Sequence, residues 1–84
     1  MNDSFGTPIG EGDLIASIAH STGRAKIGRV IRNSSGNLAM SLLLESFGTK
    51  VYAPDKRTGP IGSGVVVLEF ADGTVPDPLA VLYG

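Results

Sequence analysis

The sequence predicts an all-β fold, a small barrel or sandwich of five to six short strands. Apolar residues recur at period two through much of the region from residue 24 to residue 53, as they do in strands with one buried face. Turn-forming residues separate these stretches at regular intervals, and glycine, at 12 of 84 residues, is about twice as frequent as usual. A chain of 84 residues has room for a single hydrophobic core. We therefore expect one β domain over residues 13–84.

The first twelve residues are expected to form a flexible arm ahead of this domain. Glycine and proline interrupt the segment at four positions, namely Gly6, Pro8, Gly10 and Gly12. Residues of these two types favour turns and loops over regular structure. Residues 1–12 are therefore assigned to an N-terminal arm.

Residues 13–22 fit either a strand or a short helix. In a helix, Leu14 and Ile18 would share one face, and Asp13 would cap the N-terminus. In a strand, Leu14, Ala16 and Ile18 would lie on one side of a sheet. We expect a strand here, with one short helix as the alternative.

The next three strands are expected to form a meander. Residues 24–32 and 37–44 both alternate, and residues 33–36 between them are Asn-Ser-Ser-Gly, which are turn-forming types. Residues 45–48 make a second turn, and residues 49–53 a third strand. Each strand should therefore pair with the one before it.

The last third of the chain is expected to hold a loop and two further strands. Residues 54–63 are rich in glycine, proline and charge, so we expect an exposed loop. Residues 64–71 contain an unbroken run of valines, typical of a central strand buried on both faces. Asp72-Gly73 is a hairpin signal, and residues 79–83 form a last short strand or docked tail.

Composition excludes several classes of site. The chain has no cysteine, which rules out disulfides and thiolate metal ligands and fits a reducing cytoplasm. Its one histidine, His20, cannot hold a structural zinc alone, and a metal site built with Asp13 and Glu11 has little in its favour. No apolar run approaches the roughly 18 residues of a membrane span. We therefore expect a cytoplasmic protein with no cofactor, no metal and no membrane contact.

One cluster has a catalytic composition. Asp13, Ser17 and His20, with Ser21 and Thr22 beside them, supply a carboxylate, hydroxyls and an imidazole. A nucleophile built from these types also needs a strained turn and an oxyanion hole, and no such turn is visible in the sequence. A small hydrolase-type enzyme around His20 is therefore a distant third interpretation, and we expect no enzyme.

The glycine-rich segment at residues 59–64 has the composition of a phosphate-binding loop. A phosphate loop ends in Gly-Lys-Ser/Thr and leads into a helix, whereas this segment lacks that ending and precedes the predicted strand at 64–71. We therefore expect a connector.

The charges are unevenly distributed along the chain. Residues 1–13 carry three acids and no base, residues 14–57 carry seven bases against two acids, and residues 58–84 carry three acids and no base. This pattern favours pairing of the acidic ends with the basic middle. The other interpretation is a basic face for an acidic partner.

The predicted strand register places a set of basic residues on one outward face. If residues 33–36 form a four-residue turn, Arg32 faces Asn37 and Arg24 faces Glu45. The candidate binding residues on this face are Arg24, Lys26, Arg32, Lys50 and Tyr52. Arg29 falls on the opposite, apolar side, which predicts either a β-bulge near Gly28 or a position for Arg29 at the rim of the sheet.

Three segments resemble the turns and strands of SH3-like barrels. They are Gly12-Asp13-Leu14-Ile15, the Gly23–Arg32 strand, and Phe70-Ala71-Asp72-Gly73. The expected fold is a small barrel or sandwich that is SH3-like or OB-like in style. The aromatic cage with which some members bind peptides or methyl-lysine is missing here.

The expected function is that of a non-catalytic interaction or assembly module, an accessory protein that binds another macromolecule or itself. A homo-oligomer is favoured because residues 79–83 are apolar and Pro76 and Pro78 stiffen the lead into them. The alternative is a module that binds single-stranded nucleic acid on the basic face of residues 24–32 and 49–53, where cations would follow phosphates and Tyr52 would stack on a base.

Overall fold

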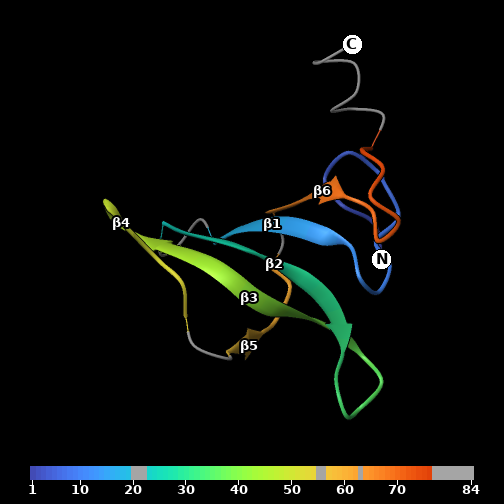
Figure 1. Cartoon of the computed structure of the whole chain (residues 1–84), viewed down its shortest axis with the longest axis horizontal. Helices are drawn as coiled ribbons and strands as arrows, with labels where there is room; N and C mark the ends of the chain where they lie inside the picture. Colours follow the sequence, from blue (N-terminus) through green and yellow to red (C-terminus); the bar gives the residue numbers. More distant parts are fainter. Residues whose placement is uncertain (20–22, 55–56, 63, 77–84) are drawn as a thin grey trace.

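A computed structural model describes residues 1–19, 23–54, 57–62 and 64–76 of the chain. These residues form one six-stranded antiparallel sheet (Figure 1). Its strands are β1 (Leu14–Ala19), β2 (Arg24–Arg32), β3 (Leu38–Phe47), β4 (Lys50–Tyr52), β5 (Thr58–Gly59) and β6 (Gly64–Glu69). The described residues contain no helix, so the all-β prediction is confirmed. The strand expected within residues 13–22 is present as β1.

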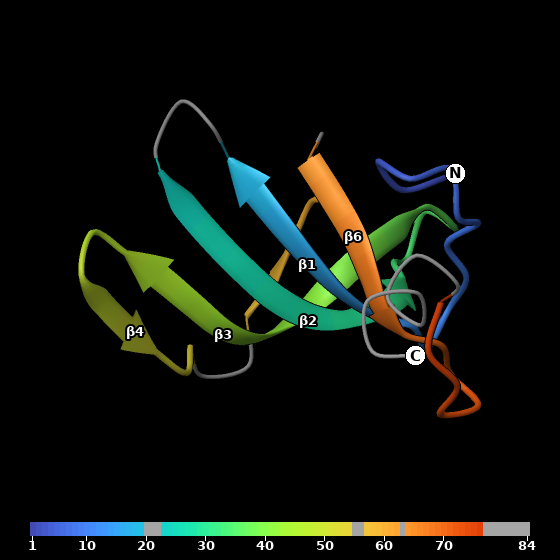
Figure 2. The ribbon, with the colours of Figure 1, turned by 90° about the horizontal axis from the view of Figure 1, so that it is seen from above.

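The sheet is curled but open. Its strand order is β4-β3-β2-β1-β6, and β5 pairs with β3 on the edge that β4 also uses (Figure 2). Residues Met40 and Ser41 of β3 pair with β5, and the last three residues of β3 pair with β4. β3 bends along its length, which lets one ten-residue strand serve both partners.

The hairpin between β2 and β3 has a shorter loop than the sequence predicts. Asn33 and Asn37 form the closing pair, since the Asn33 amide donates to the Asn37 carbonyl at 2.9 Å. The Asn33 side chain accepts from the amides of Ser35 and Asn37, and Gly36 takes a positive φ of 83°. This three-residue loop with a left-handed last residue is a common hairpin connection.

The shorter loop shifts the strand register by one residue. Arg32 pairs with Leu38, and Val30 with Met40, so the predicted pairing of Arg32 with Asn37 is wrong. Because a slip of one residue turns every side chain to the other face, the core side of β2 carries Val30 in place of Ile31.

A β-bulge interrupts the β2–β3 pairing where the sequence predicts one. Gly28 pairs with Leu42 and Ile27 pairs with Leu44, so Leu43 is an extra residue in β3. The bulge near Gly28 is confirmed. Beyond it the faces of β3 exchange, and Glu45 is buried while Leu44 is exposed.

The core lies on one face of the sheet, which we call the inner face. It consists of Ile9, Ile15, Val30, Met40, Leu42, Val65 and Val67, with Leu38, Ile61 and Phe70 packed against it. Most of these side chains are aliphatic, as the low aromatic content of the chain requires. Four strands and the arm therefore share a single core.

The N-terminal arm packs against the sheet. Ile9 belongs to the core, and the Ser4 amide donates to the Val65 carbonyl at 2.8 Å. The Asp3 carboxylate accepts from the Val67 amide at 3.0 Å. The arm therefore lies along the free edge of β6.

β6 is an edge strand of the sheet, so the predicted central position is wrong. Val65 and Val67 are buried, but Val66 and Leu68 are only half-buried. Along the edge of β6 that faces away from β1, the arm supplies contacts to the backbone that a neighbouring strand would otherwise supply. The run of valines therefore belongs to a strand that buries one face in the core and has its edge covered by the arm.

The predicted loop at 54–63 contains β5. After β5 the chain passes from the edge of β3 toward β1, where the Gly62 amide donates to the Ser17 hydroxyl at 3.1 Å. Ile61 meets the core on the way. We call residues 57–62 the crossing segment, and it covers the middle of the inner face.

The predicted turn at Asp72-Gly73 is present. The Phe70 amide donates to the Thr74 carbonyl at 2.8 Å, and the Gly73 amide donates to the Phe70 carbonyl at 2.9 Å. Gly73 has a positive φ of 89°. The strand expected at residues 79–83 lies outside the described residues.

Candidate interaction surfaces

The five candidate binding residues lie on one face, but it is the inner face and not an outward one. Strand pairing sets Lys26 opposite Glu45, and Glu45 opposite Tyr52, so these side chains point to the same side. Arg24, Arg32 and Lys50 share that side by alternation along their strands. The prediction that the set shares a face therefore agrees with the strand pairing, whereas the outward orientation is wrong.

Arg32 stands apart from the other four. It lies at the far end of β2, where its guanidinium contacts Glu11 at 3.3 Å and the Gly36 carbonyl at 2.6 Å. The core and the crossing segment lie between Arg32 and the β4 end of the sheet. The structure therefore brings together Arg24, Lys26, Lys50 and Tyr52 only.

A buried carboxylate organises the β4 end of the inner face. Glu45 is 1% exposed, and the Tyr52 hydroxyl donates to its Oε1 at 2.7 Å. Arg24 lies 3.6 Å from Oε1, and Arg57 lies 3.8 Å from Oε2. We call these four residues the Glu45 cluster. Glu45 Oε2 accepts no hydrogen bond from the described residues.

The cluster perturbs the ionisation of both its acidic members. The hydrogen bond from Tyr52 lowers the pKa of Glu45 most, burial opposes this, and the charges of Arg57, Arg24 and Lys26 lower the pKa further. The same hydrogen bond raises the pKa of Tyr52. Glu45 is therefore held as a carboxylate under two guanidinium groups.

Two aromatic rings lie at the cluster, that of its member Tyr52 and that of Phe47 beside it. The Arg24 guanidinium lies 4.6 Å from the centre of the Phe47 ring, which is a cation–π contact. Phe47 is 52% exposed and Tyr52 is 41% exposed. Phe47 was not among the residues predicted from the sequence, although its spacing of two from Glu45 places both on one face of β3.

The opposite face of the sheet, which we call the outer face, is apolar. Pairing places Val51, Leu44, Ile27, Ala16 and Val66 on this side of successive strands. Val51 is 69% exposed, Ile18 48% and Leu44 42%. An open apolar depression lies over β2, β3 and β4, lined by Ala25, Ile27, Leu44, Ser46 and Val51 among others.

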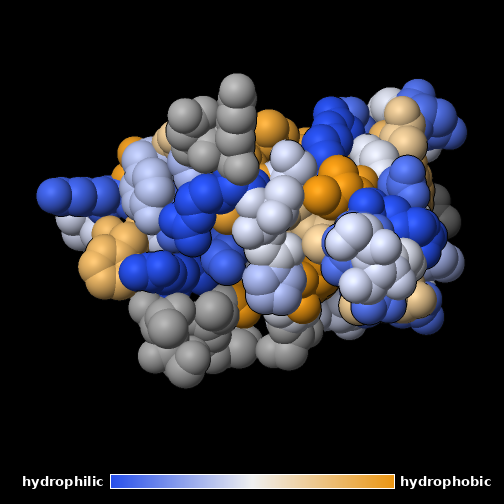
Figure 3. Space-filling model, turned by 90° about the horizontal axis from the view of Figure 1, so that it is seen from below, coloured by the Kyte–Doolittle hydropathy of each residue, from blue (hydrophilic) through white to orange (hydrophobic). Residues whose placement is uncertain are grey.

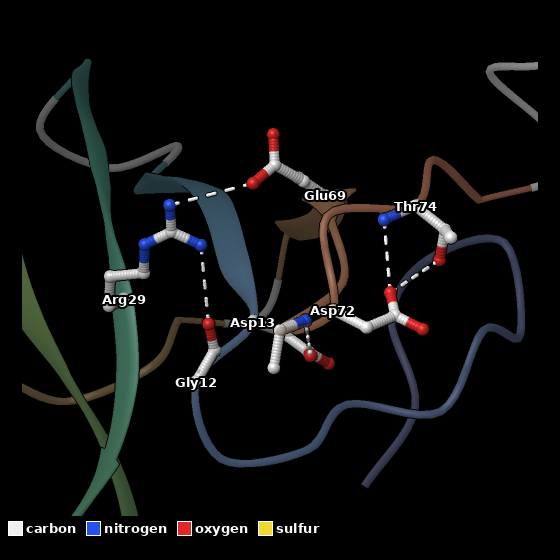
Figure 4. Close-up of polar contacts among 7 residues, drawn as sticks. Gly12, Asp13, Arg29, Glu69, Asp72 and Thr74 are labelled. Carbon is white, nitrogen blue, oxygen red and sulfur yellow. Dashed lines mark hydrogen bonds and ion pairs between the residues drawn. The ribbon is translucent and has the colours of Figure 1, made fainter.

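An ion pair bounds the outer face at its far end. Arg29 lies 3.6 Å from Glu69 and also donates to the Gly12 carbonyl at 3.3 Å (Figure 4). With the Arg32–Glu11 contact, this pairs the basic middle of the chain with both acidic ends. Arg24 and Arg57 instead pair with an acid from the middle itself.

The described members of the catalytic candidate bind backbone amides. Asp13, which is labelled in Figure 4, is buried. Its carboxylate accepts from the Gly10 amide at 2.8 Å and from the Ala71 amide at 3.0 Å. Ser17 is buried and accepts from Gly62. His20, Ser21 and Thr22 lie outside the described residues. Both described side chains therefore hold loops against the sheet.

Neither a metal centre nor a membrane span is found in the described part of the chain. No three acidic or imidazole side chains there are grouped as metal ligands. No helix in the same residues has the length and apolarity to cross a bilayer.

The fold and its surfaces define a small all-β protein with one open, curled sheet that is apolar outside and has a basic, aromatic end inside. Comparisons with protein-family models, with curated proteins and with solved structures find no match for this chain.

Proposed function

We propose that this protein is a non-catalytic assembly module that binds a second copy of itself, or another protein, through its outer face. The observation that carries the proposal is the exposed apolar surface running from Val51 on β4 to Ile18 on β1. A β-sheet with an apolar face gains stability by burying that face against another layer. In the described residues, the outer face has no such layer.

A second copy supplies the simplest layer. Two sheets pack face to face at a separation of about 10 Å, with side chains from the two faces interleaved. A two-fold axis through the depression would pair the same apolar residues of both copies. This arrangement also enlarges the core of a small chain that has no disulfide.

The non-catalytic part of the proposal is supported by the engagement of Asp13 and Ser17 with backbone amides. The curled sheet is compatible with a barrel of SH3-like or OB-like style, which would need hydrogen bonds between its edges. Barrel closure and a cytoplasmic location remain predictions.

The test is the oligomeric state of the full chain over a hundredfold range of concentration, measured by light scattering and sedimentation. We expect a dimer that dissociates on dilution. Leu44→Lys with Val51→Lys should be monomeric at every concentration, with an unchanged far-ultraviolet spectrum. Phe5→Lys alters an apolar side chain of the arm that is 63% exposed and should associate as the parent does.

Two outcomes would contradict the proposal. One is a parent protein that stays monomeric throughout and captures no other protein on the outer face. The other is a double variant that associates as strongly as the parent, because the contact would then lie elsewhere.

A further inference from the structure

We propose that the β4 end of the inner face binds single-stranded nucleic acid, with cations holding phosphates and two aromatic rings stacking on bases. The residues concerned are Arg24, Lys26, Phe47, Lys50, Tyr52 and Arg57, which we call the basic–aromatic patch. This surface lies on the opposite side of the sheet from the assembly face, so the inference goes beyond the function proposed above.

The charge of the patch is locally positive although the chain as a whole carries −1. Among the residues that the structure describes, its cations lie around a single carboxylate, that of Glu45, and the Glu45 side chain has no exposed surface. The guanidinium side chains above it are 40% exposed at Arg24 and 53% exposed at Arg57. Solvent and ligands therefore meet the cations and not the acid that positions them.

Figure 3 shows the molecule from the side on which β5 lies. Strongly hydrophilic residues lie over the half of this side that belongs to the β4 end, as they do over the other half, with apolar residues between them. A surface that binds single-stranded nucleic acid combines cations with apolar rings, since each nucleotide presents one charge and one flat base.

The two rings are held in place before any ligand arrives. Tyr52 is anchored through its hydroxyl to Glu45, and Phe47 packs under the Arg24 guanidinium. A ring whose orientation is already fixed loses less conformational entropy on binding. Bases stack on aromatic rings and on guanidinium planes alike, so Arg24 extends the stacking surface that Phe47 begins.

The rings favour nucleic acid over an acidic protein. A purely acidic polymer such as polyglutamate would use the cations alone, because it has no ring or apolar side chain to pack on the exposed faces of Phe47 and Tyr52. Duplex DNA hides its bases in the stack, so it would also leave the rings unused. Single-stranded nucleic acid uses both parts of the patch.

The experiment measures fluorescence anisotropy of a labelled oligothymidylate of about 15 nucleotides with the full chain. We expect binding that weakens with added salt, by about 0.7 log units per log of salt for each phosphate contacted. The duplex of equal length should bind at least tenfold more weakly. Polyglutamate of equal charge should compete poorly.

Matched variants locate the site. Lys50→Glu reverses an exposed cation, and with Lys26→Glu it should weaken binding more than tenfold. Phe47→Ser should weaken binding while leaving the salt dependence unchanged, because it removes stacking and no charge. Arg32→Glu reverses a cation on the same face but beyond the core and should bind as the parent does. Far-ultraviolet spectra check that each variant is folded.

The inference is overturned if the oligonucleotide does not bind, or if Arg32→Glu weakens binding as much as Lys50→Glu. Polyglutamate that competes as well as the oligonucleotide would also overturn it, in favour of an acidic protein partner. The assembly proposal is independent, because Leu44→Lys with Val51→Lys should leave the affinity for the oligonucleotide unchanged.

Discussion

Glu45 points into the inner face of the sheet, where strand alternation alone would have placed the side chain of Leu44. In an unbroken β3, alternation from Met40 through Leu42 would turn Leu44 inward and Glu45 outward. The extra residue at Leu43 reverses this order. A carboxylate therefore enters the buried face, and it is tolerated there because Tyr52 and two arginines meet it.

The lowered pKa of Glu45 predicts a specific acid sensitivity. Its stabilising effect is present above the ordinary glutamate pKa of about 4.3 and is lost as the pH falls through the lower folded-state value. The free energy of unfolding should be smaller for Glu45→Gln than for the parent at pH 7. This difference should shrink as the pH falls below the ordinary glutamate pKa and on through the lowered folded-state pKa, where the parent carboxylate becomes protonated too.

Urea denaturation of both proteins between pH 7 and pH 3 measures this difference. The carboxylates of Asp3 and Asp72 also have a lowered pKa, but they are present in both proteins and cancel in the comparison. Tyr52→Phe removes the largest cause of the Glu45 shift and should reduce the acid sensitivity. A difference between Glu45→Gln and the parent that does not vary with pH would contradict the assignment.

Gly28 is required by the close approach of β2 and β3 at the bulge. A Cβ built on Gly28 would collide with the Ser41 carbonyl oxygen and lie 3.2 Å from the Leu42 Cα. These are backbone atoms and cannot rotate away. Gly28→Ala should therefore destabilise the protein by about 1–3 kcal/mol, the usual cost of overpacking, in chemical denaturation.

Gly59→Ala is the matched control for that substitution. A Cβ on Gly59 would have its nearest neighbour, the flexible end of Lys26, at 3.8 Å. We expect this variant to unfold near the parental midpoint. Equal loss of stability in both variants would mean that glycine is needed for a reason other than the bulge.

At the scale of elements, the N-terminal arm acts as an additional edge of the sheet. Asp3 is buried, and although burial raises its pKa, hydrogen bonds from the amides of Val67, Thr7 and Phe5 outweigh this and lower it. An exposed sheet edge can pair with other chains. By occupying the side of β6, the arm covers one such edge.

Ile9→Ala should show how much the arm contributes. Ile9 is 7% exposed within the core, so its truncation should lower the free energy of unfolding by roughly 2–4 kcal/mol. Phe5→Ala, in the same arm but 63% exposed, should cost far less. Thermal and urea unfolding would measure both. A small effect of Ile9→Ala would indicate that the arm is not bound to the sheet in solution.

At the scale of the whole molecule, one sheet presents two unlike surfaces. The inner face is divided between the aliphatic core and the basic–aromatic patch, and the outer face is apolar from β4 to β1. The two proposals use opposite faces, since self-association would use the outer face and single-stranded nucleic acid would bind on the inner face. Each binding event would leave the opposite face unaltered.

A version of the chain that ends at Asp77 tests what residues 78–84 contribute to the molecule. If these residues pair only with another subunit, the shortened chain should stay folded and lose association. Light scattering and a far-ultraviolet spectrum distinguish the cases. A shortened chain that is unfolded would show that the tail completes its own sheet, and an unchanged oligomer would remove the tail from the interface.

Local patterns were enough to predict most of the strands, although β5 lies in a predicted loop and β3 continues through Phe47 into the predicted turn at 45–48. The predicted strand at 24–32 coincides with β2. A bulge is present at Gly28, but the register from which it was predicted is wrong, since Arg29 pairs with Ser41 and the extra residue is Leu43 of β3. Alternation is a property of neighbouring residues, and it places Arg24 with Lys26, and Lys50 with Tyr52, on one face of each strand. That the two pairs share a face of the sheet depends on the hairpin register and on the bulge in β3.

The orientation of that face depended on interactions between distant residues. A hairpin loop of three residues in place of four turned the β2 side chains over, and the N-terminal arm and the crossing segment at 57–62 covered one half of the inner face. No local pattern announces Arg57 beside Glu45, because a loop residue is placed by the pairing of β5 with β3. Alternation states which side chains share a face, but burial depends on which segments pack over it.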